Sequence, residues 1–152
     1  MSLINAGNFV NPCVSGDQIR PIDGFKYGYI QQTITPAGAA GYDLTDQLPI
    51  GAVVLNAQIK LSATVVCTTA VKIGLGRKES TADPDKYALT SALTAATYSG
   101  TKITVTGVLA DASAAETLRV FACDTNGAAA GTLDSGGTIT CRVNYRVYES
   151  ID

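Results

Sequence analysis

Apolar and polar residues alternate along the segment from Leu48 to Val66, which reads LPIGAVVLNAQIKLSATVV. A period of two residues is typical of a β-strand with one face in a core and the other in solvent. The pattern assigns alternate apolar residues to the buried face: Leu55, Ala57, Ile59, Leu61, Ala63 and Val65. The exposed face then carries Asn56, Gln58, Lys60, Ser62 and Thr64. This segment predicts a packed β scaffold whose function lies on its surface.

The same alternation recurs through the chain and is interrupted by segments rich in glycine, proline and aspartate. It predicts strands over 25–34, 70–77, 116–123 and 138–150, and a hairpin at Ser99-Gly100. Val71, Ile73 and Leu75 are expected to point inward. Gly74 and Gly76 leave bare backbone on the other side, which indicates a bulge or a close approach by another chain. Many short strands with almost no helix favour one antiparallel β-sandwich.

The first 24 residues are not periodic, yet they are more apolar than an ordinary flexible tail. Leu3, Ile4, Phe9 and Val10 supply this apolar character. Two arrangements are open, because an apolar terminus must be tied to some surface. The segment either packs as an extended arm on a neighbouring subunit or folds back on its own domain. We therefore divide the chain into an N-terminal arm, residues 1–24, and a β-sandwich domain, residues 25–152.

Composition argues against an enzyme. The 152 residues include no histidine, so triads that use a histidine base are excluded. Carboxylate pairs could still serve a glycosidase, and the candidates are Asp43 with Asp46, Asp83 with Asp85, and Asp111 with Glu116. Each lies in a turn or at a strand end, where aspartate is common for its own backbone hydrogen bonds. We expect no catalytic residue.

The sequence also gives little support for a cofactor, a metal site, nucleic-acid binding or a membrane span. The four cysteines, Cys13, Cys67, Cys123 and Cys141, lack zinc-ligand spacing and are expected to be reduced. Asp124 to Gly127 suits a turn better than a calcium loop, and a surface calcium site at Asp83 and Asp85 stays open. A net charge of −2 with scattered basic residues gives no case for nucleic acid. No apolar run approaches the length of a membrane span, and no signal peptide is recognisable.

Tyrosine is the one enriched polar aromatic residue, with seven copies. Four of them lie on the first and last predicted strands: Tyr27, Tyr29, Tyr145 and Tyr148. Tyrosine is favoured at protein interfaces because it buries area while keeping a polar tip. An exposed binding surface and ordinary core packing are both open for these residues.

A series of short motifs from Tyr42 to Tyr148 resembles small structural proteins of tailed bacteriophages. The matching motifs are Pro49-Ile50-Gly51-Ala52, Val54-Leu55, Ile73-Gly74, Asp83-Pro84-Asp85-Lys86-Tyr87 and Val143-Asn144-Tyr145-Arg146. The resemblance implies a jelly-roll-like β-sandwich of the capsid decoration (cement) type. The first 24 residues and the cysteine content depart from the pattern.

The resemblance implies a non-enzymatic virion protein, most simply a homotrimer seated on the lattice of the phage major capsid protein. It would assemble in the host bacterial cytoplasm and lie at the capsid surface. The expected partner-binding residues are Leu3, Ile4, Phe9, Val10, Asn56, Gln58, Lys60, Tyr145 and Tyr148. The alternative is a tail-fibre, baseplate or carbohydrate-binding module that recognises a host glycan through exposed tyrosines and the turn at Asp83–Tyr87.

Overall fold

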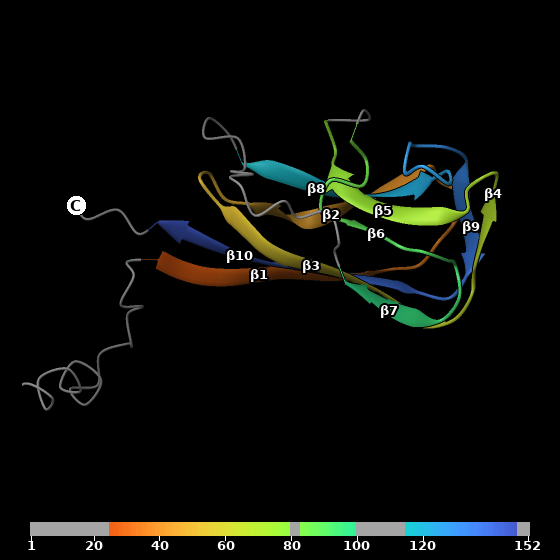
Figure 1. The fold of residues 1–152 in the computed structure, drawn as a ribbon, viewed down its shortest axis with the longest axis horizontal. Helices are drawn as coiled ribbons and strands as arrows, with labels where there is room; N and C mark the ends of the chain where they lie inside the picture. The colour runs from red at the N-terminus through yellow and green to blue at the C-terminus, as the bar shows by residue number, and fades with distance from the viewer. Residues whose placement is uncertain (1–24, 80–82, 100–114, 149–152) are drawn as a thin grey trace, which may run out of the picture.

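The computed structural model describes residues 25–79, 83–99 and 115–148. These residues form ten strands and no helix (Figure 1). The strands are β1 (Phe25–Ile34), β2 (Gly41–Leu48), β3 (Val53–Leu61), β4 (Val65–Thr68), β5 (Lys72–Arg77), β6 (Ala88–Leu89), β7 (Ala96–Ser99), β8 (Glu116–Cys123), β9 (Thr132–Gly136) and β10 (Ile139–Tyr148). The expected all-β class is confirmed.

Two four-stranded antiparallel sheets face each other, with strand orders β1-β10-β3-β7 and β2-β8-β5-β6. Strands β4 and β9 pair separately and close one end of the sandwich (Figure 1). Strands β1 and β3 belong to one sheet, and β2 and β5 belong to the other. Later in the chain, β8 inserts between β2 and β5, and β10 inserts between β1 and β3. This interleaved order defines a jelly roll.

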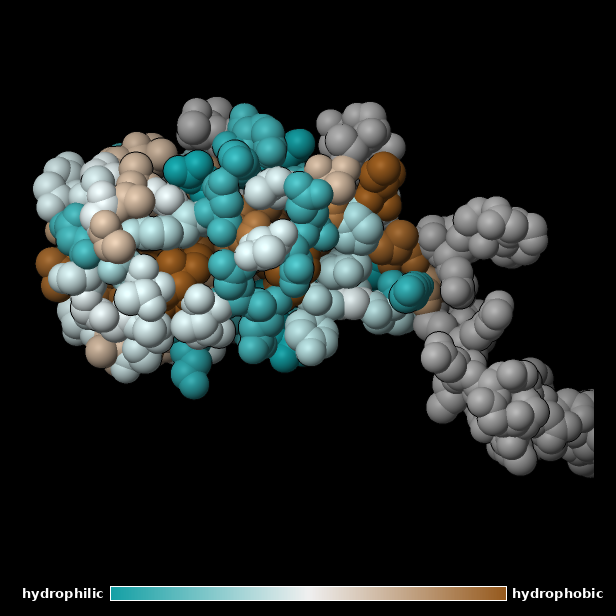
Figure 2. All heavy atoms as spheres, turned by 180° about the vertical axis from the view of Figure 1, so that it is seen from behind, coloured by the Kyte–Doolittle hydropathy of each residue, from teal (hydrophilic) through white to brown (hydrophobic). Residues whose placement is uncertain are grey.

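The core lies between the two sheets and is built from the alternate residues that each strand turns inward. Its fully buried side chains include Leu48, Ile59, Ile73, Leu75, Leu118, Val120, Leu133, Ile139 and Val143. Figure 2 shows, from behind, hydrophobic atoms in a band between hydrophilic side chains above and below. A buried Leu or Ile contributes roughly 1.5–3 kcal/mol relative to an exposed one, so this row of side chains dominates the stability of the sandwich.

The inward position predicted for Leu55 is wrong, because a β-bulge interrupts the alternation there. Asn144 of β10 pairs with Asn56, whereas the next residue, Tyr145, pairs with Val54. Leu55 is therefore the additional residue of the bulge, and its side chain is 41% exposed. A bulge shifts the phase of one strand against its partner. Val54 is consequently buried together with Ala57.

The long alternating segment is two strands rather than one. Strand β3 ends at Leu61, and β4 begins at Val65 and pairs with β9. Ala63 lies in the corner between them and is exposed, so its predicted burial is wrong. The backbone of Ala63 passes over Gly137, where an added Cβ would approach the Ala63 oxygen to 2.4 Å. The chain turns at this point without a glycine or proline of its own.

Gly74 and Gly76 admit the backbone of the Asp83-Pro84-Asp85 segment across the outer side of β5. A Cβ on Gly74 would lie 2.7 Å from the Pro84 oxygen, and one on Gly76 would lie 2.6 Å from the Asp83 oxygen. The glycines do permit a close approach, but it is made by the protein's own chain and not, as expected, by another chain. Val71 precedes β5 and is 46% exposed, so its predicted inward position is wrong.

Some predicted features fall outside the described residues. These are residues 1–24, with Leu3, Ile4, Phe9 and Val10, and the second strand of the hairpin predicted at Ser99-Gly100. The part of the chain that the structure describes contains no helix long and apolar enough to cross a membrane. The division into an arm and a domain stays a prediction.

Candidate partner-binding face

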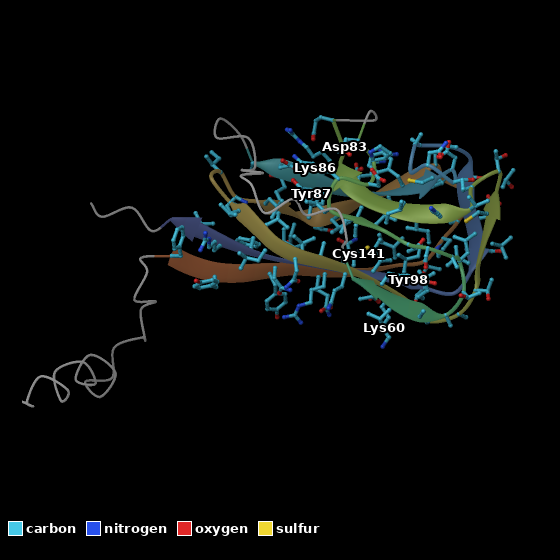
Figure 3. The ribbon with its side chains drawn as sticks, in the orientation of Figure 1. Lys60, Asp83, Lys86, Tyr87, Tyr98 and Cys141 are labelled. Carbon is cyan, nitrogen blue, oxygen red and sulfur yellow. The ribbon has the colours of Figure 1, made fainter. Side chains whose placement is uncertain are left out.

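Three of the predicted partner-binding residues lie side by side on the outer side of one sheet. Asn56, Gln58 and Lys60 alternate along β3 with Ala57 and Ile59, which are buried. All three are exposed, and Figure 3 shows Lys60 projecting away from the opposite sheet. We call the outer side of these neighbouring strands the β1–β10–β3 face. Partner binding by this face stays a prediction.

Aromatic and guanidinium groups stack on the β1–β10–β3 face. The guanidinium of Arg142 lies 4.3 Å from the ring centre of Tyr29, and that of Arg146 lies 4.1 Å from the ring centre of Phe25. Both pairs cross from β10 to β1 along the diagonal of the antiparallel register. Tyr29 is 60% exposed and Tyr27 is 51% exposed. The two tyrosines thus offer large amphipathic surfaces beside ordered cations.

A chain of hydrogen bonds links the three strands across the same face. The Asn144 amide donates to Oδ1 of Asn56 at 2.6 Å, joining β10 to β3. The Arg142 guanidinium donates to Oδ1 of Asn144 at 3.2 Å and to Oε1 of Gln31 at 3.5 Å. The amide orientation follows from this network, because each oxygen faces a donor. These bonds hold the polar side chains in fixed positions before any partner arrives.

Tyr145 belongs to the inside of the sandwich, so it does not lie on the β1–β10–β3 face. It is half-buried and packs on the core. Its ring covers Gly28 of β1, where an added Cβ would lie 2.6 Å from Cζ of Tyr145. Tyr145 lies on the same side of β10 as the buried residues Cys141 and Val143, and it therefore also points inward. The side chain of Tyr148 is outside the described part of the molecule.

Charge is segregated between the two sheets. The strands β1, β10, β3 and β7 carry four cationic side chains, Lys26, Lys60, Arg142 and Arg146, and no carboxylate. The remaining described residues carry five cationic and eight acidic side chains, a net charge of −3. The scattered basic residues of the sequence are thus gathered, in part, on one sheet. The signal was present in the strand sequences, but only the pairing of β1, β10 and β3 brings them together.

A buried charged cluster lies on the opposite sheet. Glu116 is 2% exposed and accepts a hydrogen bond from the hydroxyl of Tyr87. Nε of Arg77 lies 3.1 Å from Oε2 of Glu116, and Nζ of Lys86 lies 4.0 Å from Oε1. Burial, followed by the bond to Glu116, raises the pKa of Tyr87, and burial lowers the pKa of Lys86. Figure 3 shows Lys86 and Tyr87 at the upper sheet, away from Lys60.

This cluster gives the Asp83-Pro84-Asp85-Lys86-Tyr87 motif a structural role. We call the contact of Tyr87 and Lys86 with Glu116 the latch. Tyr87 is 1% exposed and inserts toward Glu116, while Asp85 is 3% exposed. A Cβ on Gly127 would lie 2.0 Å from Oδ2 of Asp85, so that carboxylate occupies the space beside this glycine. The motif fastens the loop before β6 to the start of β8 and to the turn after it. Sequence reasoning treated this turn as a surface feature and missed Glu116 as its anchor.

The candidate carboxylate pairs differ in burial and in their partners. Asp85 is buried, whereas Asp83 is exposed, so the two do not share a surface calcium site. Asp43 is engaged by Lys78 at 2.8 Å and by Arg119 at 3.3 Å. Asp111 lies outside the described residues. Within 25–79, 83–99 and 115–148, no cluster of three or more cysteine, aspartate or glutamate side chains is arranged to hold a metal.

The turn predicted at Asp124–Gly127 is confirmed. Oδ1 of Asp124 accepts hydrogen bonds from the backbone amides of Asn126 at 2.8 Å and Ala128 at 3.0 Å. Gly127 takes a φ of +91°, which suits glycine. The Asp124 carboxylate is therefore used by its own backbone.

Cys67 and Cys141 are free thiols. Cys141 is fully buried, as its phase on the last strand predicts, and burial raises its pKa to about 12. Cys67 is half-buried, and its pKa is raised by burial and by the nearby Asp134 carboxylate. Both thiols are held in the neutral form at neutral pH, which makes them poor nucleophiles.

Two exposed apolar side chains lie in the β2–β3 turn and early in β3. Ile50, in the turn between β2 and β3, is 53% exposed, and Leu55 on the bulge is 41% exposed. The β2–β3 turn lies at the end of the sandwich where β1 begins and β10 ends (Figure 1). Phe25, where the described part of the chain begins, lies at this same end.

Comparison with known proteins identifies the class of fold. No protein-family model and no curated sequence matches the chain. Solved structures of similar shape come from bacteriophage capsids. Two of them have TM-scores above 0.5 at less than 25% identity, and they establish a shared β fold.

Two of these structures align with more than four fifths of this chain. A chain in the capsid of Ralstonia phage GP4 is 18% identical, with a TM-score of 0.56 over 87% of this chain and 91% of that one. A chain in the acidic stable capsid structure of Helicobacter pylori bacteriophage KHP30 is 13% identical, with a TM-score of 0.55 over 83% and 90%. A chain in the cyanophage Pam1 capsid asymmetric unit is 17% identical over 88% and 95%, with a TM-score of 0.48.

Proposed function

We propose that this protein is a non-enzymatic structural component of a bacteriophage virion, and specifically a capsid decoration (cement) protein. The observation that carries the proposal is its jelly-roll fold, which aligns over most of its length with chains of similar extent in two phage capsid structures. A fold alone does not define a function. The candidate face agrees with this role, because it offers tyrosine, arginine and amide groups to a partner.

In this proposal the chain assembles in the host bacterial cytoplasm as a homotrimer and then seats on the major capsid protein lattice. Buried apolar area at the subunit joints would contribute roughly 25 cal/mol per Å², before the cost of ordering is subtracted. Leu3, Ile4, Phe9 and Val10 would add contacts by ordering on a neighbouring subunit. Neither nucleic acid nor membrane is a partner in this mechanism.

Separation of purified particles into heads and tails tests the proposal. We expect mass spectrometry to detect the protein in the head fraction in stoichiometric amounts. Its presence in tails alone would favour the tail alternative, and its absence from both fractions would refute a virion role. A monomer by light scattering at concentrations well above micromolar would refute the trimer.

Deletion of residues 2–20 tests the arm separately. We expect the truncated protein to remain folded and to occupy far fewer capsid positions, because contacts with neighbouring subunits are lost. Occupancy is measured from the protein content of purified heads, with circular dichroism as the check on folding. Unchanged occupancy would show that the arm makes no contribution to assembly.

The tail-fibre or carbohydrate-binding alternative is favoured by one observation. Tyr27 and Tyr29 are more than half exposed and lie beside the amides of Gln31 and Asn144, a combination suited to sugar rings and hydroxyls. Tyr87 is buried, so the Asp83–Tyr87 turn does not contribute a tyrosine to such a site. Specific binding on an array of bacterial surface glycans, lost on changing Tyr29 to Ala, would support this alternative over the cement role.

A further inference from the structure

We propose that the β1–β10–β3 face binds an acidic surface of another protein. The inference rests on the proposed function, because a structural component of a virion needs a partner surface. It adds the chemistry of that partner, which the fold alone does not provide. The argument starts from the charges on the two sheets.

The cations of this face are not neutralised within the described part of the chain. Arg142 contacts the Tyr29 ring and the oxygens of Asn144 and Gln31, all of them uncharged. Arg146 stacks on Phe25. On the opposite sheet, by contrast, Arg77, Lys78 and Arg119 each approach a carboxylate. The β1–β10–β3 face therefore keeps positive charge available for a partner.

The same cations are already ordered. Stacking on Tyr29 and Phe25 holds two guanidinium groups in place, and a network of amide bonds joins β1, β10 and β3. A pre-ordered guanidinium loses less conformational entropy when it binds a carboxylate through two parallel hydrogen bonds. Lys60, at the β3 side of the face, adds a flexible third charge. These are features of a recognition surface rather than of a merely solvated one.

A protein fits this face better than a nucleic acid does. Strong nucleic-acid binding depends on about six to ten phosphate contacts, whereas this face offers Lys60, Arg142 and Arg146. The net charge of −2 also opposes long-range attraction of a polyanion. Tyrosine and arginine together, rimmed by amides, are the composition enriched at protein interfaces. The occupant is therefore a carboxylate-rich protein surface.

Binding of a labelled poly-L-glutamate peptide of about 20 residues tests this chemistry, with single-stranded DNA of similar length as the comparison. Fluorescence anisotropy gives the affinity of the full-length protein at low and at physiological salt. We expect Lys60→Glu to weaken peptide binding about three- to tenfold, because one attractive charge becomes repulsive. Lys72→Glu is the matched control: it makes the same change on β5, in the other sheet, where Lys72 donates to the Thr125 carbonyl.

Each outcome decides the proposal. Salt-sensitive peptide binding that Lys60→Glu weakens and Lys72→Glu leaves unchanged supports it. Equal effects of the two variants, or no peptide binding at low salt, overturn it. Tighter binding of the DNA through Lys60 overturns it in favour of nucleic acid. The location of the protein in the particle is measured independently, so failure here leaves the virion proposal standing.

Discussion

The hydroxyl of Tyr87 donates to a carboxylate that the sandwich has almost completely buried. Glu116 would be costly to bury alone, because an ionised carboxylate loses its hydration in the core. Tyr87, Arg77 and Lys86 replace part of that hydration. The partners are distant in sequence, since Tyr87 and Glu116 are 29 positions apart. Sequence patterns therefore revealed the DPDKY motif and left its anchor unseen.

Tyr87→Phe tests the latch. We expect it to lower the free energy of unfolding by about 1–2 kcal/mol, because the ring stays while Glu116 loses its hydroxyl donor. Urea denaturation measures the change. Tyr98→Phe is the control, since its hydroxyl makes only long contacts of 3.3 and 3.5 Å near Thr94, and it should cost less than about 0.5 kcal/mol. Equal effects of the two variants would argue against the latch.

Burial of Cys141 makes the free energy of unfolding depend on pH in the alkaline range. Burial raises the pKa of its thiol from 9.0 to about 12, so the folded protein keeps a proton that the unfolded chain loses above pH 9. Stability from this group is complete below pH 9 and is lost as pH rises toward 12, by about 1.4 kcal/mol per pH unit. Denaturation of wild type and Cys141→Ala at several pH values isolates this group, because all others are common to both. Parallel profiles would contradict the buried thiol.

At the scale of single elements, the strand pattern predicted most of the structure and failed where a partner strand intervened. The alternation places Ala57, Ile59 and Leu61 correctly, because burial of one face is a local property of a strand. The bulge at Leu55 depends on how β10 pairs with β3, and those residues are almost ninety positions apart. The corner after Leu61 has no glycine or proline to mark it. The backbone of Ala63 fits there because Gly137, far along the chain, has no side chain.

Alanine substitutions at Leu55 and Leu61 distinguish the bulge from an uninterrupted strand. Leu61 is 2% exposed, so Leu61→Ala should lower the free energy of unfolding by about 2–5 kcal/mol. Leu55→Ala should cost less than about 1 kcal/mol, because the side chain is already 41% exposed. Thermal or urea denaturation provides both values. A large loss at Leu55 would mean that it packs in the core after all.

At the scale of the whole molecule, a small net charge conceals a strong asymmetry. The sheet β1-β10-β3-β7 carries cations without a carboxylate, while the rest of the described chain is net acidic. The total of −2 gave no indication of this division, because it depends on which strands become neighbours. The jelly-roll order was expected from resemblance and is confirmed by strand pairing. The predicted partner residues were located only in part: Asn56, Gln58 and Lys60 share a face, and Tyr145 turns inward.

A reconstruction of the assembled particle at subnanometre detail tests the cement role. We expect jelly-roll density on the outer surface of the capsid, repeated in groups of three over the lattice of the major capsid protein. Such density should disappear from particles that lack this protein. Density confined to the tail, or particles that show no difference without the protein, would contradict the proposed function.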